Sequence, residues 1–102
     1  MQFRQGDIYF VQVDGDYQGE KVKRQNNRIV IAEGEITGHA HAIHDKNATM
    51  YRDSVQDLEW LVVDAPVKVV HEEHATINLP AGIWQVIHQR QYVRGDIRRV
   101  LD

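Results

Sequence analysis

The chain has no cysteine among its 102 residues. Disulfide bonds, thiolate-bound zinc and cysteine nucleophiles are therefore excluded. Serine is nearly absent as well, because Ser54 is the only one, and it lies in a polar stretch with no histidine beside it in the sequence. A serine-based catalytic triad is not expected. Any metal that this chain binds must take nitrogen and oxygen ligands.

Long apolar runs are also missing. The longest are only a few residues, as in Leu61-Val62-Val63, whereas a membrane-spanning helix needs about 20. Residues 1–7 lack the basic start and the apolar stretch of a secretory signal. We therefore expect a cytoplasmic protein with no membrane partner. A net charge of −3 gives no general attraction to nucleic acid, which proteins bind through clustered lysine and arginine.

The sequence does contain a repeated alternation of apolar and polar residues, which is typical of half-buried β-strands. The polar stretch 14–28 predicts a long loop or loose hairpin, and a short helix at 53–61 is the alternative to a strand there. Eight or so short strands in a chain of this size predict one all-β domain, either a small β-barrel or a β-sandwich. The expected strands lie within 6–16, 28–34, 39–45, 48–53, 58–65, 67–74, 75–79, 83–93 and 96–101.

Six histidines form two clusters, with one further histidine near the end of the chain. In the first cluster, GHAHAIHD, alternation along a strand places His39 and His41 on one face and His44 on the other. Side chains two residues apart on a strand are roughly 6–7 Å apart at the backbone. The imidazoles of His39 and His41 can therefore converge on one ion, and His44 is expected at the surface.

The second cluster is HEEHATINLPAG, which begins with His71, Glu72, Glu73 and His74. Its histidines are three residues apart, so it is not the H-E-x-x-H motif of zinc peptidases. On a regular strand the two rings would diverge, and they reach one centre only if a turn or bulge lies between them. Glu72 or Glu73 is a candidate general base.

His88 lies in the middle of the last long strand segment, whose two faces both carry apolar residues. We therefore expect it to be at least partly buried. A hydrogen-bonded core residue is one interpretation of such a histidine. A further metal ligand is the other, if the first cluster lies across a barrel from it.

The order G-x-x-x-G-H-x-H, followed later by L-P-x-G and a strand with histidine, resembles the two-part motif of cupins, which are small β-barrel proteins. The resemblance implies that His39 and His41 bind one divalent metal inside a barrel together with a later histidine, and that Pro80-Ala81-Gly82 is the conserved turn of the second motif. Two features depart from the cupin pattern. The late histidine would fall near Gln85, whereas this chain has His88, and the glutamate expected after H-x-H is replaced by an Asp-Lys pair.

The two stretches EGEITGHAHAI and HEEHATINLPAGIWQVIHQRQY together are also similar to a group of short bacterial and phage proteins of unassigned function. This second resemblance is the more specific one. It implies a family but supplies no activity.

Two functions remain open from the sequence. The first is a metal-binding protein or a metal-dependent small-molecule enzyme, with zinc, iron, manganese or nickel as the cofactor. The second is a non-enzymatic, phage-related interaction module whose histidines are structural. Small β domains often pair their edges with another copy, so a homo-oligomer is expected in either case. The candidate metal ligands are His39, His41, His71, His74 and His88.

Overall fold

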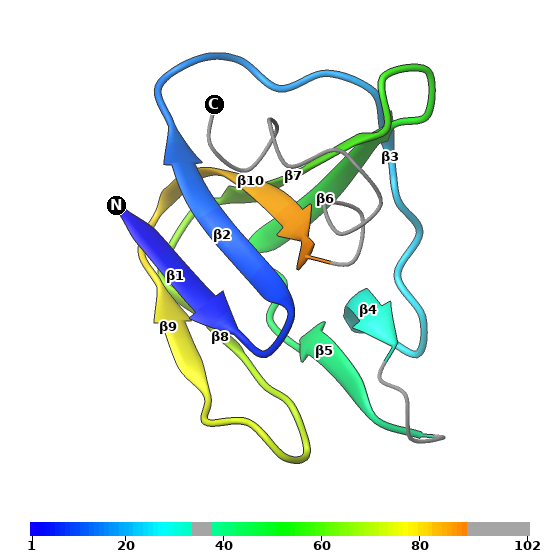
Figure 1. Cartoon of the computed structure of the whole chain (residues 1–102). Helices are drawn as coiled ribbons and strands as arrows, with labels where there is room; N and C mark the ends of the chain where they lie inside the picture. Colours follow the sequence, from blue (N-terminus) through cyan, green and yellow to red (C-terminus); the bar gives the residue numbers. More distant parts are fainter. Residues whose placement is uncertain (34–37, 90–102) are drawn as a thin grey trace.

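The computed structural model describes residues 1–33 and 38–89, and every regular element in these ranges is a β-strand (Figure 1). The all-β class expected from the sequence is therefore confirmed. The strands are β1 (Gln2–Gln5), β2 (Ile8–Val13), β3 (Glu20–Lys21), β4 (Ile29–Glu33), β5 (Ala40–Ile43), β6 (Ala48–Asp53), β7 (Leu58–Val63), β8 (Val67–Val69), β9 (Ile77–Leu79) and β10 (Gly82–His88).

Six of these strands form one antiparallel sheet in the order β1-β2-β10-β7-β6-β3. The alternation of side chains decides which face is buried. Phe10 of β2 lies opposite Val86 of β10, and Trp84 of β10 lies opposite Leu61 of β7. These four side chains are buried, so their cross-strand pairs form the inner face of the sheet.

The other four strands form two antiparallel ribbons, β4–β5 and β8–β9. A pair of backbone hydrogen bonds joins the ribbons: the N–H of Ala42 donates to the oxygen of Val70 at 3.0 Å, and the N–H of Val70 donates to the oxygen of Ala42 at 2.9 Å. Because the two segments run antiparallel at this bridge, the residue before Ala42 lies next to the residue after Val70. These two residues are His41 and His71.

Buried side chains from the sheet and from both ribbons make one apolar core. Phe10, Leu61 and Trp84 come from the sheet, Ile43 comes from β5 and Val69 from β8, and all five are fully buried. Burying an apolar side chain of this size contributes about 1.5–3 kcal/mol. The core therefore fixes the ribbons, which carry most of the histidines, against the sheet.

The alternation predicts most of these strands, with two differences. It does not predict β1, whose sequence QFRQ is largely polar but which pairs with β2 through a tight turn at Gly6-Asp7. The alternation also predicts a strand over 67–74 that is too long, because β8 ends at Val69 and the chain then turns. The alternative helix at 53–61 is a turn followed by β7. The predicted strand at 96–101 and the end of the one at 83–93 lie outside the described residues.

The described sheets do not close into a barrel, because β1 and β3 are the two edges of the six-stranded sheet. The strands that would have to continue it are short: β3 has two residues, and β8 and β9 have three each. A closed barrel needs a continuous ladder of paired strands. The barrel expected from the sequence, and the cupin-like form implied by the resemblance, are therefore not confirmed. Residues 1–33 and 38–89 also contain no helix with the length and hydropathy needed to span a bilayer.

Gly19, directly before β3, has a φ of +108°, which side chains rarely permit. A Cβ atom there would lie 2.3 Å from the backbone oxygen of Arg52 in β6. We expect Gly19→Ala to lower the free energy of unfolding by about 2–4 kcal/mol, because the backbone must move. Gly15→Ala is the control, since a Cβ there meets no atom within 4 Å, and it should change stability by less than about 0.5 kcal/mol. Urea denaturation measures both, and equal stabilities would contradict this packing.

Candidate functional site

Four of the six histidines come together where β5 meets the end of β8. His41 lies in β5 and His39 directly precedes this strand, and His71 and His74 follow β8. The backbone bridge between the two ribbons aligns these segments, although about thirty residues separate them in the chain. We call these four residues the histidine cluster.

The rings of the cluster are in mutual contact. The ring centre of His71 lies 4.4 Å from that of His41, 4.6 Å from that of His74 and 6.0 Å from that of His39. The rings of His41 and His74 are stacked, with centres 5.9 Å apart and an angle of 12° between their planes. His71 is therefore the central ring, and the pair predicted from the first motif, His39 and His41, contacts it from two sides.

A turn between His71 and His74 allows both rings to reach the cluster, as the spacing of the motif required. Residues 72–74 form a bend and no strand. Within it, the backbone N–H of Glu73 donates to Nδ1 of His71 at 3.0 Å. Because Nδ1 accepts this bond, a neutral His71 carries its proton on Nε2.

Gln5 fixes the orientation of His41. The side-chain nitrogen of Gln5 donates to the backbone oxygens of Val69 and Ala75, both at 2.9 Å. Both amide hydrogens are thereby used, so Oε1 of Gln5 must accept, and it lies 2.8 Å from Nδ1 of His41. His41 therefore carries its proton on Nδ1, and its Nε2 has the free lone pair.

Gln5 and its neighbour Gly6 are parts of the site that no pattern in the sequence indicates. Gln5 is only 2% exposed and is one of two buried polar residues, with His41, in the described chain. Gly6 has a φ of +58°, and a Cβ on it would lie 2.7 Å from Nε2 of His74 and 3.3 Å from Cε1 of His41. A Gly-Asp dipeptide before an alternating segment is a signal for such a turn, but the histidines it covers are far away in the sequence.

The buried position of His41 changes its basicity. Burial, together with the charges of His71 and His74 when these are protonated, lowers the pKa of His41 from 6.5 to about 4. His41 is only 6% exposed, so its charged form would lose most of its hydration. At neutral pH it is therefore an uncharged imidazole, which is the form that binds metals.

The two predicted general bases, Glu72 and Glu73, flank the cluster in different ways. Oε1 of Glu72 accepts the backbone N–H of Ala40 at 2.8 Å. This bond and one from its own N–H lower the pKa of Glu72, which makes it a weaker base. Glu73 lies with Oε1 3.3 Å from Nδ1 of His39 and is half exposed. Both residues are exposed, and they differ in that the Glu72 carboxylate is held by a backbone N–H.

His88 lies outside the cluster and pairs with Glu59. Its Nε2 is 2.5 Å from Oε1 of Glu59, and its side chain is 24% exposed, as expected for a partly buried histidine. Arg52 donates to the other oxygen of Glu59 at 2.7 Å. Burial would raise the pKa of Glu59, but the hydrogen bonds and charges of His88 and Arg52 outweigh it and lower the pKa. His88 is thus held by a carboxylate, as the hydrogen-bonded interpretation expects, and is near enough for its charge to act on His41.

Two further observations limit the site. His44 is exposed, as predicted for the opposite face of the strand. Among residues 1–33 and 38–89, no three His, Asp or Glu side chains are arranged so that they hold a metal ion together. The histidine cluster therefore brings imidazole rings together without aiming three nitrogen atoms at one point.

The first prediction from this geometry concerns Gln5. Gln5→Leu leaves Nδ1 of His41 and two backbone oxygens without partners, and each buried unpaired group costs about 1–3 kcal/mol. We expect a loss of about 2–4 kcal/mol in the free energy of unfolding and a change in the histidine tautomer seen by long-range ¹H–¹⁵N spectra. Gln2→Leu, at an exposed position of the same strand, is the control. Equal effects of the two substitutions, or a His41 proton on Nε2 in the unsubstituted protein, would disprove this hydrogen-bond scheme.

The second prediction concerns acid. Since the pKa of His41 is about 4 in the folded protein and about 6.5 in an unfolded chain, the unfolded state binds a proton first as the pH falls. The stability that neutral His41 contributes is fully present above pH 6.5 and is lost as the pH falls to about 4. With chelator present, the free energy of unfolding should fall by about 2 kcal/mol between pH 7 and pH 5. His41→Gln should reduce this slope and His44→Gln should keep it; the same slope in all three proteins would refute the assignment.

Comparisons with known proteins give one match. A search of curated proteins and a search of solved structures found no match to the chain. The model of one protein family matches residues 4–89, a range that contains the histidine cluster, Gln5, Glu59 and His88. This agrees with the family of unassigned function suggested by the sequence, and the comparisons give no support to the cupin resemblance. The chain therefore belongs to the family described as Domain of unknown function (DUF8820).

Proposed function

We propose that this protein binds a divalent transition-metal ion, with zinc as the first candidate, at the histidine cluster. The observation that carries the proposal is the convergence of four imidazoles from two distant segments, with neighbouring ring centres 4.4–6.0 Å apart. Neutral imidazole is a common ligand of zinc, nickel and iron. A chain without cysteine has no better ligand for such an ion.

The spacing of the rings supports the proposal. Two imidazoles that bind one tetrahedral zinc ion, with Zn–N distances of about 2.0–2.1 Å, have ring centres about 5 Å apart. The separations in the histidine cluster lie on both sides of this value. A bound metal ion also requires that the ring nitrogen atoms point at one place. His74 is exposed and His39 is half-buried, so we propose that these two rings rotate toward Nε2 of His41 when the ion binds.

His41 is the best candidate for the anchoring ligand. Histidines that bind metals usually donate their other N–H to a fixed oxygen, which sets the tautomer and the ring orientation. The bond from Nδ1 of His41 to Oε1 of Gln5 is of this kind. We propose Nε2 of His41 and the ring of His74 as the first two ligands, with a third nitrogen from His39, because Nδ1 of His71 already accepts the N–H of Glu73.

A bound ion with an open position would supply a Lewis acid and a water of lowered pKa, which is the chemistry of a metal-dependent enzyme on a small molecule. The chain's own part would be proton transfer. Glu73 is better suited to this than Glu72, because the Glu72 carboxylate is held by the backbone of Ala40 and has a lowered pKa. His88, paired with Glu59, is proposed as a charge near the site and not as a ligand.

The alternative is a non-enzymatic interaction module, phage-related in origin, whose histidines are structural. The hydrogen bonds of Gln5 to His41, Val69 and Ala75 favour it, because they would stabilise the fold without any metal. Under this alternative the chain would act through a protein partner or a second copy of itself. The homo-oligomer and the cytoplasmic location remain predictions in both cases.

Metal titration separates the two functions. We expect zinc to raise the melting temperature of the chelator-treated protein by about 10 °C at a concentration a hundredfold above the dissociation constant, since that ratio stabilises the fold by about 2.7 kcal/mol. His74→Gln should remove most of this increase without unfolding the protein, because His74 is exposed. Metal analysis of the purified protein should give about one ion per chain.

His44→Gln is the matched control, because His44 is an exposed histidine close to the cluster in sequence but on the other face. It should leave the increase with zinc unchanged. A purified protein that contains no metal, and whose melting temperature does not respond to zinc or to chelator, would contradict the proposal and favour the structural alternative.

A further inference from the structure

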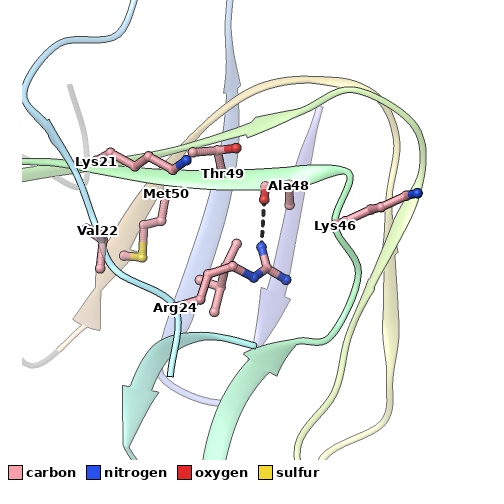
Figure 2. Close-up of a pocket in the computed structure, with 8 residues that line it drawn as sticks. Lys21, Val22, Arg24, Lys46, Ala48, Thr49 and Met50 are labelled. Atoms are coloured by element: carbon pink, nitrogen blue, oxygen red, sulfur yellow. Dashed lines mark hydrogen bonds between the residues drawn. The ribbon is translucent and has the colours of Figure 1, made fainter. Parts of the chain in front are cut away.

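A second concave site lies between β3, β4 and β6, beside the stretch that leads from β3 to β4 (Figure 2). It is a pocket of about 150 Å³. Three of its lining residues are basic, four are apolar and none is acidic. They are Lys21, Val22, Arg24, Ile29, Lys46, Ala48, Thr49 and Met50.

Arg24 is a half-buried cation without a carboxylate partner in the described part of the chain. Its guanidinium donates only to backbone oxygens: to Asp45 at 2.7 Å, to Ala48 at 3.1 Å and to Asn27 at 3.3 Å. The ion pairs among the described residues involve Glu59 and Glu73 and do not include Arg24. Carbonyl dipoles orient the guanidinium but do not cancel its charge, and charges removed from water are usually neutralised.

Lys21 adds a second positive charge at the same place. Its side chain extends along the rim toward Thr49, whereas that of Lys46 points away from the pocket (Figure 2). Lys21 also forms no ion pair with a carboxylate among residues 1–33 and 38–89. A local excess of positive charge in a chain of net charge −3 attracts a small anion to this pocket.

The apolar side of the pocket limits the kind of anion. Val22, Ile29, Ala48 and Met50 line it. Ile29, Ala48 and Met50 are only 1–2% exposed, so half-buried Val22 presents most of the apolar surface that a ligand can reach, and this surface favours an apolar ligand group over water. An enclosed apolar cavity of about 150 Å³ accepts one benzene ring, and this pocket has that volume but is open to solvent on one side. A bare inorganic anion would leave this surface without a partner.

We propose that this pocket binds a small organic carboxylate that carries one apolar group about the size of a benzene ring. The carboxylate lies near Lys21 and Arg24, and the apolar group lies against Val22, above the buried side chain of Met50. The site contains none of the histidines and does not depend on the metal proposed for the histidine cluster. It gives this protein a second ligand, of opposite charge to the first.

The test uses benzoate as the probe and the full chain as the protein. In ¹H–¹⁵N and methyl NMR titrations, benzoate should give saturable shifts centred on Val22, Thr49 and Met50. Benzyl alcohol, which keeps the ring but has no charge, and inorganic phosphate, which keeps the charge but has no ring, should each bind at least about fivefold more weakly. Lys21→Gln should weaken benzoate binding about two- to fivefold, as expected for the loss of one exposed charge, and raising the salt concentration should weaken it as well.

Lys68→Gln is the control variant, because Lys68 is an exposed lysine of β8 that does not line the pocket. It should bind benzoate like the unsubstituted protein. Benzyl alcohol binding as tightly as benzoate would overturn the role of the charge, and phosphate binding as tightly would overturn the role of the apolar surface. The absence of saturable shifts at Val22, Thr49 and Met50 would overturn the site itself.

Discussion

The side-chain amide of Gln5 is the interaction on which the arrangement of the histidine cluster depends. It joins β1 to the end of β8, to the turn after it and to β5 through three hydrogen bonds of 2.8–2.9 Å. None of these partners is closer than 36 residues in the sequence. Because the amide has two donors and one acceptor to satisfy, its orientation is fixed, and with it the position of the proton on His41. The buried amide of Gln5 thus sets the tautomer of the His41 ring.

The chemistry of the cluster follows from this neutral state. The neutral ring of His41 does not repel its neighbours as an imidazolium ion would, so the other rings of the cluster can lie close to it. Its Nε2 offers a lone pair, which attracts a cation. At the pocket beside Arg24 the reverse holds, since permanent positive charges attract an anion. The ribbon β4–β5 contributes to both places, because Ile29 lines the pocket at one end while Ala32 lies opposite His41 near the other.

Much of the fold follows from local pattern. Alternation predicts β2, β4, β6, β7 and β10, because in each of them one face meets the core and the other meets water or a neighbour. It also explains why His44 is exposed and why His71 and His74 need a turn between them. Alternation does not predict β1, because its sequence is mostly polar. This strand is held in place by its pairing with β2 and by the buried side chain of Gln5. Closure of the sheet also depends on the length of the pairings, which local alternation does not determine.

The site was predictable only in its residue types. The two-residue spacing on a strand indicates His39 and His41 as candidate ligands, and the three-residue spacing around a turn indicates His71 and His74. The partners that set their chemistry lie elsewhere: Gln5 for His41, Glu59 for His88 and the backbone of Ala40 for Glu72. The contact between β1, β5 and β8 brings Gln5 to His41, and the pairing of β7 with β10 brings Glu59 to His88. No periodicity within a single segment contains such contacts. Arg24 is a similar case, because in the sequence it belongs to a polar loop, and only the fold places it against the apolar floor of a pocket.

A crystal structure of the zinc-soaked protein, with anomalous data collected on both sides of the zinc absorption edge, tests metal binding at the histidine cluster most directly. We expect one anomalous peak within about 2.0–2.2 Å of Nε2 of His41, with Nδ1 of the same ring still hydrogen-bonded to Gln5. An anomalous map with no peak among the rings of the histidine cluster, or a His41 ring turned so that Nδ1 no longer faces Gln5, would contradict this expectation.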